Sequence, residues 1–573
     1  MSTPAAPPVR ELLVSARRRA LALAPRRSDY ADLPRSWRHD LVAGLTVAVV
    51  ALPLALGFGV ASGLGAGAGL VTAIVAGAVA AVLGGSHLQV SGPTGAMAVV
   101  LLPVVARHGT EAVPVVAIMA GGIVVLAGVL GLGRLVAYVP WPVVEGFTVG
   151  IGVVIALQQV PLALDTAPGP GENAALVAWG TLAAVDWSAA VAPLVVVALA
   201  VTVMLVLPRL HRGLPASLLA VVAATLLAEA AHLDVARIGP LPDLLAAPSL
   251  PVVDLATTSA LFSSALAVAA LAALESLLSA RVADGMADDI GRTSPNRELF
   301  GQGLANIASG LVGGLPATGA IARTAVNVRT GARTRVAALT HAVVLTAVVL
   351  VAAPLVARIP LSALAAVLLV TAARMIDVRT AVQVCRSGRA GALVLLATLA
   401  VTVAFDLVMA VEVGVAVAAV LALRAVARSS GLHREPLPGA DGDTLGADAE
   451  HALLHEHIAV YRVDGALFFA DVRRFLDELA LVSDVRVVVL RLGAVRVLDA
   501  SGARALADVV TDLRRRGIHV LLKGLRPEHR RLAEGVGVID ALQDPDHLFD
   551  DLGAALEHAR AHVRGTLPTT RMG

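Results

Sequence analysis

Two ionisable side chains stand alone inside long apolar stretches of the sequence. Arg323 is the only charged residue in 299–328, and Glu275 is the only one in 255–280. Because an unpaired charge inside a membrane is costly, each indicates a functional site. The Arg323 guanidinium offers a planar set of donors that suits an oxyanion, whereas the Glu275 carboxylate could bind a cation, carry a proton or pair with Arg323. In the alternative interpretations, Arg323 extends to the membrane surface and Glu275 bridges neighbouring helices.

Two short glycine-rich breaks lie at matching places in the two apolar halves of the chain. They are residues 89–96 and 314–320, and each contains proline, threonine and glycine. Irregular backbone at membrane depth occurs only where protein or a water-filled cavity covers it, and paired interruptions of this kind mark the binding sites of transporters. A helix that begins at each break would direct free N–H groups and its positive dipole end toward the gap. The pattern therefore predicts an anion transporter.

Hydroxyl side chains close to these breaks are further candidate ligands. Thr94, Thr318 and Thr324 could donate hydrogen bonds to a substrate, although threonines near helix starts often cap their own backbone instead. Ser279 lies four residues after Glu275 and therefore shares its helical face.

The composition is that of a polytopic membrane protein. The chain has 573 residues, of which 57% are hydrophobic and 15% charged. Residues 41–106 contain no Asp, Glu, Lys or Arg; as a helix this stretch would be about 100 Å long, roughly three crossings of a ~30 Å hydrocarbon core. The net charge of +2 is too small to indicate nucleic acid, and the single cysteine excludes a disulfide framework. We expect no cofactor and no metal site.

Apolar stretches predict fourteen membrane spans in two sets of seven. Arginines concentrate in the N-terminal arm, and alternate counting from a cytoplasmic arm places most other arginines on the same side. Both termini are therefore expected in the cytoplasm, and two sets with an odd number of spans must be inverted relative to one another. The predicted spans are 41–62, 67–85, 92–106, 113–133, 141–162, 189–207, 216–232, 259–280, 297–313, 320–330, 336–357, 361–377, 390–407 and 409–427.

The composition changes near residue 429, where a polar linker begins. Beyond it, the β-branched runs 485–490 and 518–522 predict buried strands, and 502–516 predicts an amphipathic helix, so we expect a small α/β domain. Ser501 precedes this helix and is expected to cap it, with phosphorylation as the alternative. The predicted segments are an arm (1–40), a transport domain (41–428, with repeats at about 41–232 and 257–428), a linker (429–450), the α/β domain (451–560) and a tail (561–573).

Several motifs resemble those of the sulfate permease (SulP) family of anion transporters, which joins a membrane domain to a C-terminal STAS domain. The resemblance covers nearly the whole chain and rests on residues 89–95, 274–279, 301–303 with Asn306, and 313–327. It implies a seven-plus-seven inverted repeat with core and gate domains that moves its substrate by an elevator-like shift. It also implies an anion site between the third and tenth helices. The residues predicted there are Thr94, Gly95, Thr318, Gly319, Ala320, Arg323 and Thr324.

The resemblance also bears on coupling and regulation. The run 275–279 is similar to the cation site of sodium-coupled cyanobacterial bicarbonate carriers, but glutamate and serine replace the aspartate and threonine at its ends. Ile321 also lacks the hydroxyl found at its position. The predicted coupling-ion residues are Glu275, Ser279, Gly319 and Ile321, with a proton or sodium as the ion. The stretch 499–502 resembles the phosphorylation loop of anti-sigma-factor antagonists, with Ser501 at the acceptor position.

The favoured function is secondary active transport of a small anion such as sulfate, bicarbonate or a dicarboxylate, and we expect no enzyme activity. A passive anion channel or an exchanger is the alternative. A nucleobase–proton symporter of related fold would not need Arg323, and a membrane-anchored regulator would not need two helix breaks. We expect a multi-pass protein of the bacterial inner membrane that forms a homodimer, with cytoplasmic regulators acting through the STAS domain and no nucleic-acid partner.

Overall fold

The computed structural model describes most of the chain. The described residues are 23–30, 32–134, 139–171, 173–211, 214–241, 248, 255–287, 290–405, 407–429, 431–435, 457–467, 485–542 and 544–565. They form two compact units, Met1–Ala416 and Val417–Gly573.

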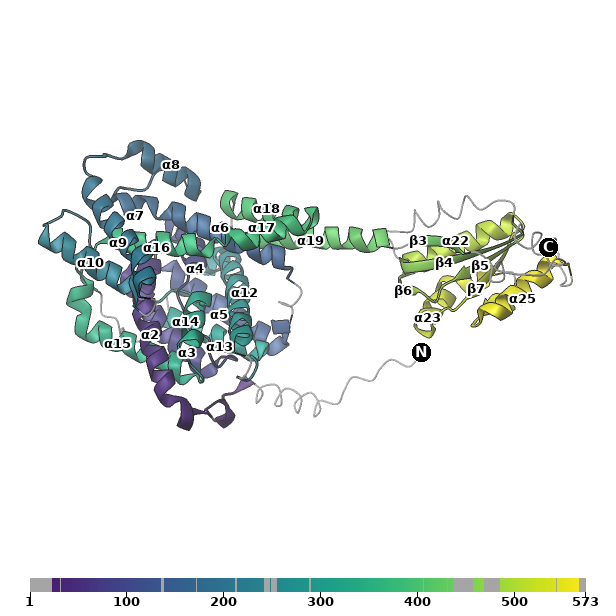
Figure 1. Ribbon diagram of the computed structural model, residues 1–573, viewed down its shortest axis with the longest axis horizontal. Helices are drawn as coiled ribbons and strands as arrows, with labels where there is room; N and C mark the ends of the chain where they lie inside the picture. Colours follow the sequence, from purple (N-terminus) through teal and green to yellow (C-terminus); the bar gives the residue numbers. More distant parts are fainter. Residues whose placement is uncertain are drawn as a thin grey trace. The chain divides into compact units, whose positions relative to one another are not determined.

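Helices make up the regular structure of the first unit in its described residues, apart from two very short strands (Figure 1). In its first half, a 3-10 turn η1 (Arg27–Tyr30) and strand β1 (Ser91–Gly92) accompany the helices α2 (Leu33–Ala61), α3 (Ala66–Leu83), α4 (Gly95–His108), α5 (Ala112–Leu130), α6 (Trp141–Gln158), α7 (Val160–Leu164), α8 (Ala174–Ala184), α9 (Val191–Leu210) and α10 (Ala216–Ala230). The second half contains strand β2 (Thr318–Gly319) and the helices α11 (Leu255–Ala260), α12 (Phe262–Met286), α13 (Pro295–Leu311), α14 (Ile321–Arg329), α15 (Val336–Val356), α16 (Leu361–Met375), α17 (Val378–Ser387) and α18 (Arg389–Ala404). Helix α19 (Leu407–Ser429) begins in the first unit and continues into the second.

These helices agree closely with the predicted spans. Eight of the described helices are long and apolar enough to cross a membrane. Short helices, α4 and α14, follow the two glycine-rich breaks, as the interrupted pattern predicts. The full count of fourteen crossings stays a prediction. Helix α2 begins at Leu33 rather than at 41, so part of the predicted arm is helical.

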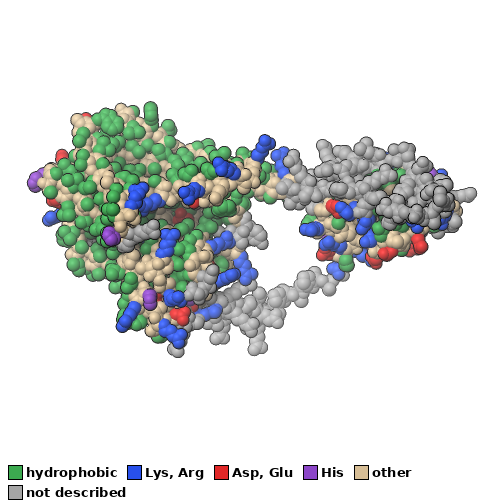
Figure 2. Space-filling model, viewed as in Figure 1, with side chains coloured by type: hydrophobic (Ala, Val, Ile, Leu, Met, Phe, Trp, Pro, Cys, Tyr) green, Lys and Arg blue, Asp and Glu red, His purple; other side chains and the backbone are tan. Residues whose placement is uncertain are grey.

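Large apolar side chains cover much of the outside of the first unit. Figure 2 shows hydrophobic side chains over much of its visible face, and Leu350 and Val351 of α15 are 68% and 83% exposed. In water such a surface would be unfavourable, whereas hydrocarbon accepts it. The exposed apolar surface therefore supports a membrane location for this unit.

Glycines allow the backbones of α5 and α13 to touch. A Cβ built on Gly121 would lie 2.6 Å from the Gly303 carbonyl oxygen, and a Cβ on Gly303 would lie 2.6 Å from the Gly121 carbonyl oxygen. Lipid supplies no hydrophobic driving force for helix association, so membrane helices depend on close van der Waals packing. Small residues at a helix crossing allow that close approach. This contact matters because α13 ends at Leu311, directly before the second glycine-rich break at 314–320.

The second unit contains a mainly parallel sheet with helices on both faces (Figure 1). The strands β4, β5, β7 and β8 are parallel neighbours in that order, and β3 pairs antiparallel with β4. Helix α22 packs on one face and helix α25 on the other. The elements are β3 (Gly431–Glu435), β4 (Ile458–Leu467), β5 (Val487–Arg491), β6 (Val495–Leu498), α22 (Ala500–Arg515), β7 (His519–Lys523), α23 (Pro527–Val536), α24 (Val538–Ala541), η3 (Pro545–His547), β8 (Leu548–Phe549) and α25 (Leu552–Val563).

Three sequence-based expectations for this unit need correction. Residues 431–435 were expected in the linker but form β3, because an edge strand needs only backbone pairing and no apolar pattern. Helix α25 continues to Val563, into the predicted tail. Ser501 is exposed and does not cap α22; Asp499 does, because its carboxylate accepts a 2.7 Å hydrogen bond from the Gly502 N–H. Ser429, also predicted in the linker, ends α19, and the remaining linker residues, 430 and 436–450, lie outside the described residues.

Replacing Gly303 with alanine tests the close contact between α5 and α13. The added methyl group would also lie 2.6 Å from the Val125 backbone nitrogen, so the helices must separate. Overpacking of this kind costs about 1–3 kcal/mol. We expect a lower midpoint of thermal unfolding for the detergent-purified protein. Gly122→Ala, at an exposed position of α5 with open space around it, should behave like wild type. Equal midpoints for the two variants would contradict the contact.

Candidate functional site

The two glycine-rich breaks pair directly with each other. Strands β1 and β2 run antiparallel, with Ser91 opposite Gly319 and Gly92 opposite Thr318. Each strand is followed by its own short helix, so α4 and α14 leave the pair in opposite directions and both N-termini face it. Two inverted repeats, each with a helix that begins at its break, place their helix N-termini face to face in this way. The sequence analysis predicted both breaks but not their hydrogen-bonded pairing.

Neither helix N-terminus at this pair is capped by a side chain. Thr94 precedes α4 and Ala320 precedes α14, and neither N-cap residue makes a side-chain capping bond. The N–H groups of the first turn of each helix therefore lack the usual side-chain acceptors. Two positive helix ends with free donors form an environment that suits an anion.

Arg323 connects α14 to the break before α4. Its side chain is only 2% exposed, and its Nη2 donates to the carbonyl oxygen of Pro93. Its Nη1 packs against Gly92 and has no hydrogen-bond partner among the described residues. The alternative in which Arg323 extends to the membrane surface is therefore wrong. The buried guanidinium keeps donors available at the paired breaks.

Glu275 of α12 is held by two threonine hydroxyls from the two breaks. Its Oε2 accepts hydrogen bonds from Thr94 Oγ1 at 2.9 Å and from Thr318 Oγ1 at 2.6 Å. The two hydroxyl oxygens are themselves 3.3 Å apart. Among the described residues, Glu275 makes no ion pair within 4.0 Å, so the direct pairing with Arg323, one of the three roles left open by the sequence, does not form. Thr94 and Thr318 thus bind the carboxylate rather than cap their own helices.

Helix α12 makes further contacts with the second break. The Gly319 N–H donates to Ser276 Oγ at 3.0 Å. The hydroxyls of Ser279 and Thr324 lie 3.0 Å apart, and Thr324 Oγ1 also accepts from the Val90 N–H. Ser279 therefore meets Thr324 rather than the carboxylate.

Three other predicted site residues supply no polar side-chain atom. Ile321 is 40% exposed at the first position of α14. The Ala320 N–H donates to the Val90 carbonyl oxygen at 2.9 Å. Gly95 opens α4, and a Cβ there would collide with Ile155. Their assignment to substrate or ion binding stays a prediction.

Amide side chains of α13 fix the backbone of the second break. Gln302 accepts from Ser91 Oγ at 2.8 Å and donates to the Ala317 carbonyl oxygen at 2.8 Å. Asn306 accepts from the Ala317 N–H at 2.7 Å and donates to the same carbonyl at 3.0 Å. These bonds satisfy backbone groups that the break would otherwise leave unpaired at membrane depth.

Gln89 and His341 are buried polar residues whose role the sequence analysis missed. Neither amide atom of Gln89 and neither ring nitrogen of His341 has a hydrogen-bond partner among the described residues. Gln89 lies against Gly319, and His341 of α15 lies beside Gly77 and close to Arg323. Unpaired buried polar groups are rare, so their gathering indicates a place for a ligand or water. The available signal for His341 was its isolation: it is the only ionisable residue in 336–356.

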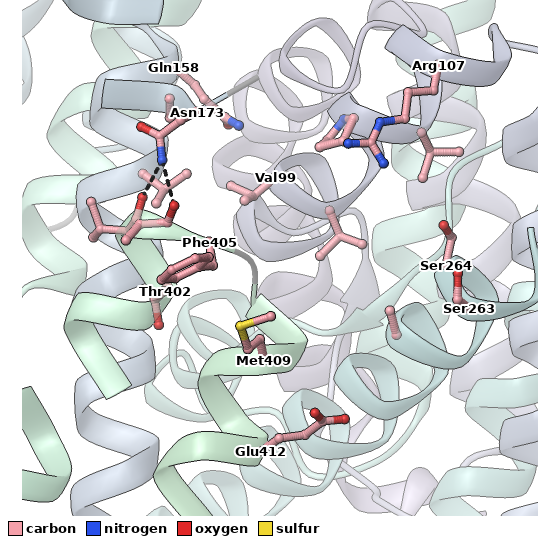
Figure 3. Close-up of a pocket in the computed structure, with 18 of the residues that line it drawn as sticks. Val99, Arg107, Gln158, Asn173, Ser263, Ser264, Thr402, Phe405, Met409 and Glu412 are labelled. Carbon is pink, nitrogen blue, oxygen red and sulfur yellow. Dashed lines mark hydrogen bonds between the residues drawn. The ribbon is translucent and has the colours of Figure 1, made fainter. Parts of the chain in front are cut away.

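A cavity of about 730 Å³ lies along α4, away from the paired breaks. Figure 3 shows its lining, with Arg107 and Glu412 among the labelled residues. Val99 and Val100 are its lining residues nearest the start of α4. Val99 is four residues from Gly95, a distance of about 6 Å along the helix axis. The cavity therefore extends along α4 from its C-terminal end towards the site, but no residue of the two breaks lines it.

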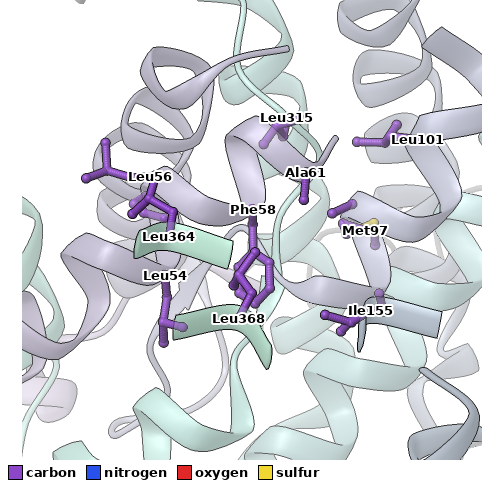
Figure 4. Packing of buried hydrophobic residues seen from close by; sticks show 14 of the residues in the cluster. Leu54, Leu56, Phe58, Ala61, Met97, Leu101, Ile155, Leu315, Leu364 and Leu368 are labelled. Atoms are coloured by element: carbon purple, nitrogen blue, oxygen red, sulfur yellow. The ribbon is translucent and has the colours of Figure 1, made fainter. Parts of the chain in front are cut away.

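Helix α4 also has densely packed apolar neighbours. Met97 and Leu101 lie in one apolar cluster with Phe58 of α2 and Ile155 of α6 (Figure 4). This packing fixes the N-terminus of α4 relative to its neighbours.

The helical unit, its interrupted helices and the paired breaks define a polytopic membrane transporter. The chain belongs to the sulfate permease family, which residues 37–398 match. Residues 452–555 match the STAS domain. The predicted family and fold class are thereby confirmed.

Known relatives span nearly the whole chain. It is 31% identical to YvdB of Bacillus subtilis, named as a sulfate transporter, over 90% of this chain and 96% of YvdB. It is 31% identical to the bicarbonate transporter BicA of Picosynechococcus over 94% of this chain and 98% of BicA. The transmembrane domain of a cyanobacterial BicA, 33% identical, covers 66% of this chain and 98% of its own, with a TM-score of 0.60. The murine anion transporter Slc26a9 in its inward-facing state covers 98% of this chain and 96% of its own, with a TM-score of 0.82 and 15% identity, and shows the fold alone.

Replacing Thr318 with valine tests the hydroxyl contacts of Glu275. Valine keeps the shape of threonine but removes one of the two donors to a largely buried carboxylate, which costs about 1–3 kcal/mol. We expect a lower unfolding midpoint in detergent for Thr318→Val. Thr318→Ser keeps the hydroxyl and should stay close to wild type. If valine proved as stable as serine, the contact would not stabilise the fold.

Proposed function

We propose that this protein is a secondary active transporter of small anions and that the anion binds between the N-termini of α4 and α14. The observation that carries the proposal is the buried Arg323 guanidinium, with an unpartnered Nη1, beside two uncapped helix N-termini. A neutral nucleobase would leave this positive charge uncompensated. The relatives named as sulfate and bicarbonate transporters support an anion as the substrate.

The charges at the site suggest how transport is coupled. Each helix N-terminus contributes about +0.5 and the guanidinium +1, which sums to about +2. With Glu275 ionised the total falls to about +1, which balances a monoanion such as bicarbonate. With Glu275 protonated it stays near +2, which balances sulfate or a dicarboxylate dianion. A divalent substrate would then be carried together with a proton.

Sodium is the competing coupling ion. Glu275, Ser279 and Gly319 could contribute oxygen ligands, which hard cations prefer. However, Ile321 provides no hydroxyl, and the two threonine hydroxyls already donate to the carboxylate. These contacts favour the proton.

The cavity along α4 supplies an access route in this proposal. By the positive-inside distribution its Arg107 end lies outside the cell, and both termini lie in the cytoplasm. An elevator-like movement of α4, α12 and α14 together would expose the paired breaks to the other side. A homodimer, and regulators that bind the STAS domain, complete the proposed assembly. A passive channel would use the same residues but could not accumulate substrate.

Arg323→Ala should abolish or strongly weaken anion uptake while the protein stays folded. Hydrogen bonds to charged groups contribute about 1.5–3 kcal/mol, so losing one contact reduces affinity by roughly 10- to 150-fold. The measurement is uptake of labelled sulfate, bicarbonate and fumarate into proteoliposomes. Arg323→Lys keeps the charge but not the planar donors and should be partly active at best.

The matched control is Arg329→Ala, which removes an exposed arginine from the same helix. It should transport at the wild-type rate. Normal uptake by folded Arg323→Ala would overturn the proposed anion site.

Glu275→Gln should stop proton-driven accumulation and flatten the pH dependence of uptake. Glutamine resembles the protonated acid but cannot release a proton. Uptake would be measured with imposed proton or sodium gradients, with Glu111→Gln as an exposed carboxylate control. Wild-type uptake that requires sodium and ignores the proton gradient would reject the proton role and make Glu275 a sodium ligand.

A further inference from the structure

Three histidines of the second unit direct their ring nitrogens toward one point. His558 and His562 are four residues apart on α25 and so share a helical face, and His547 ends η3. The Nε2 atom of His562 lies 3.2 Å from that of His547 and 3.2 Å from that of His558. Candidate ligand atoms of all three lie within 4.8 Å of one another.

These separations match the coordination sphere of a small transition-metal ion. A tetrahedral zinc ion with metal–nitrogen bonds of about 2.0–2.1 Å places neighbouring ligand nitrogens about 3.3 Å apart. Two of the separations here have that length. Three protein ligands leave the fourth position of a tetrahedral site for water or another donor.

The surroundings hold the rings in place. The His519 ring, at the start of β7, stacks on His562 with ring centres 4.3 Å apart. Phe549 packs against His558 at 5.3 Å. The Asp544 carboxylate adds a favourable charge for a cation.

A hydrogen-bonded histidine cluster without metal accounts less well for this geometry. His562 Nε2 takes part in both short contacts, so it must either accept from two neighbours or share one proton between them. A cation at the centre uses all three lone pairs at once.

We propose that His547, His558 and His562 bind one divalent transition-metal ion of the zinc class. Imidazole ligands suit zinc, copper and nickel, and an all-imidazole set disfavours magnesium and calcium. The ion ties α25 to η3, which precedes the edge strand β8. It therefore stabilises the C-terminal end of the STAS domain. The sequence analysis expected no metal site because the chain has only one cysteine, and it did not consider the histidines of this segment.

The test uses the full chain in detergent, purified through a tag without histidine and stripped with chelator. Wild type should bind one zinc per chain after gel filtration, measured by elemental analysis, and magnesium should not replace it. Co²⁺ should give the intense visible absorption of a tetrahedral site. His562→Gln should weaken zinc binding, in competition with a chromophoric chelator, by at least about 100-fold, because even residues behind metal ligands contribute factors of roughly 10 to 100.

His457→Gln is the control in the same unit, since His457 lies outside the cluster. It should bind zinc like wild type. Wild type that binds no stoichiometric zinc, or a His562→Gln variant that binds it equally well, would overturn the site. The cobalt spectrum of the wild type keeps the proposal testable if a variant fails to fold, because absence of tetrahedral absorption would also refute it.

Discussion

The antiparallel pairing of Ser91–Gly92 with Thr318–Gly319 is the interaction on which the rest of the membrane unit depends. Two irregular segments at membrane depth would leave backbone donors and acceptors unpaired, and each would be costly in hydrocarbon. The pairing satisfies some of these groups, and Gln302 and Asn306 of α13 satisfy others. It also brings two helix N-termini to one place, which no pair of uninterrupted helices could do.

The paired breaks concentrate positive potential that the protein only partly compensates. Glu275 is the nearby carboxylate, yet it is held by hydroxyls from both breaks rather than by the guanidinium. Arg323 Nη1, Gln89 and His341 remain without partners among the described residues. A buried site with spare donors and surplus positive charge is stabilised when an anion occupies it. In the proposed mechanism the same carboxylate, by gaining or losing a proton, would set the charge of the anion that fits.

Much of this organisation could be predicted from sequence because it depends on local pattern. The helix breaks, the isolated Arg323 and Glu275, and the strands and helix around residues 485–522 follow from composition and periodicity. The pairing of β1 with β2 could not be predicted, because two-residue strands carry no periodic signal. Side-chain contacts such as Thr318 with Glu275 and His547 with His562 could not be predicted either, because they depend on how separate segments pack together. The Ser501 cap was wrong because α22 begins at Ala500, two residues earlier than predicted, so Ser501 lies within the helix and Asp499 takes the N-cap position.

The most direct test of the central claim is to locate an anion in the folded protein. Crystals grown with selenate, a sulfate analogue, would reveal its selenium atom by anomalous scattering. The account predicts one strong peak between the first turns of α4 and α14, within hydrogen-bonding reach of Arg323, and no such peak in crystals of Arg323→Ala. Selenate bound only elsewhere, for example along the cavity beside Arg107, with the paired breaks empty, would contradict it.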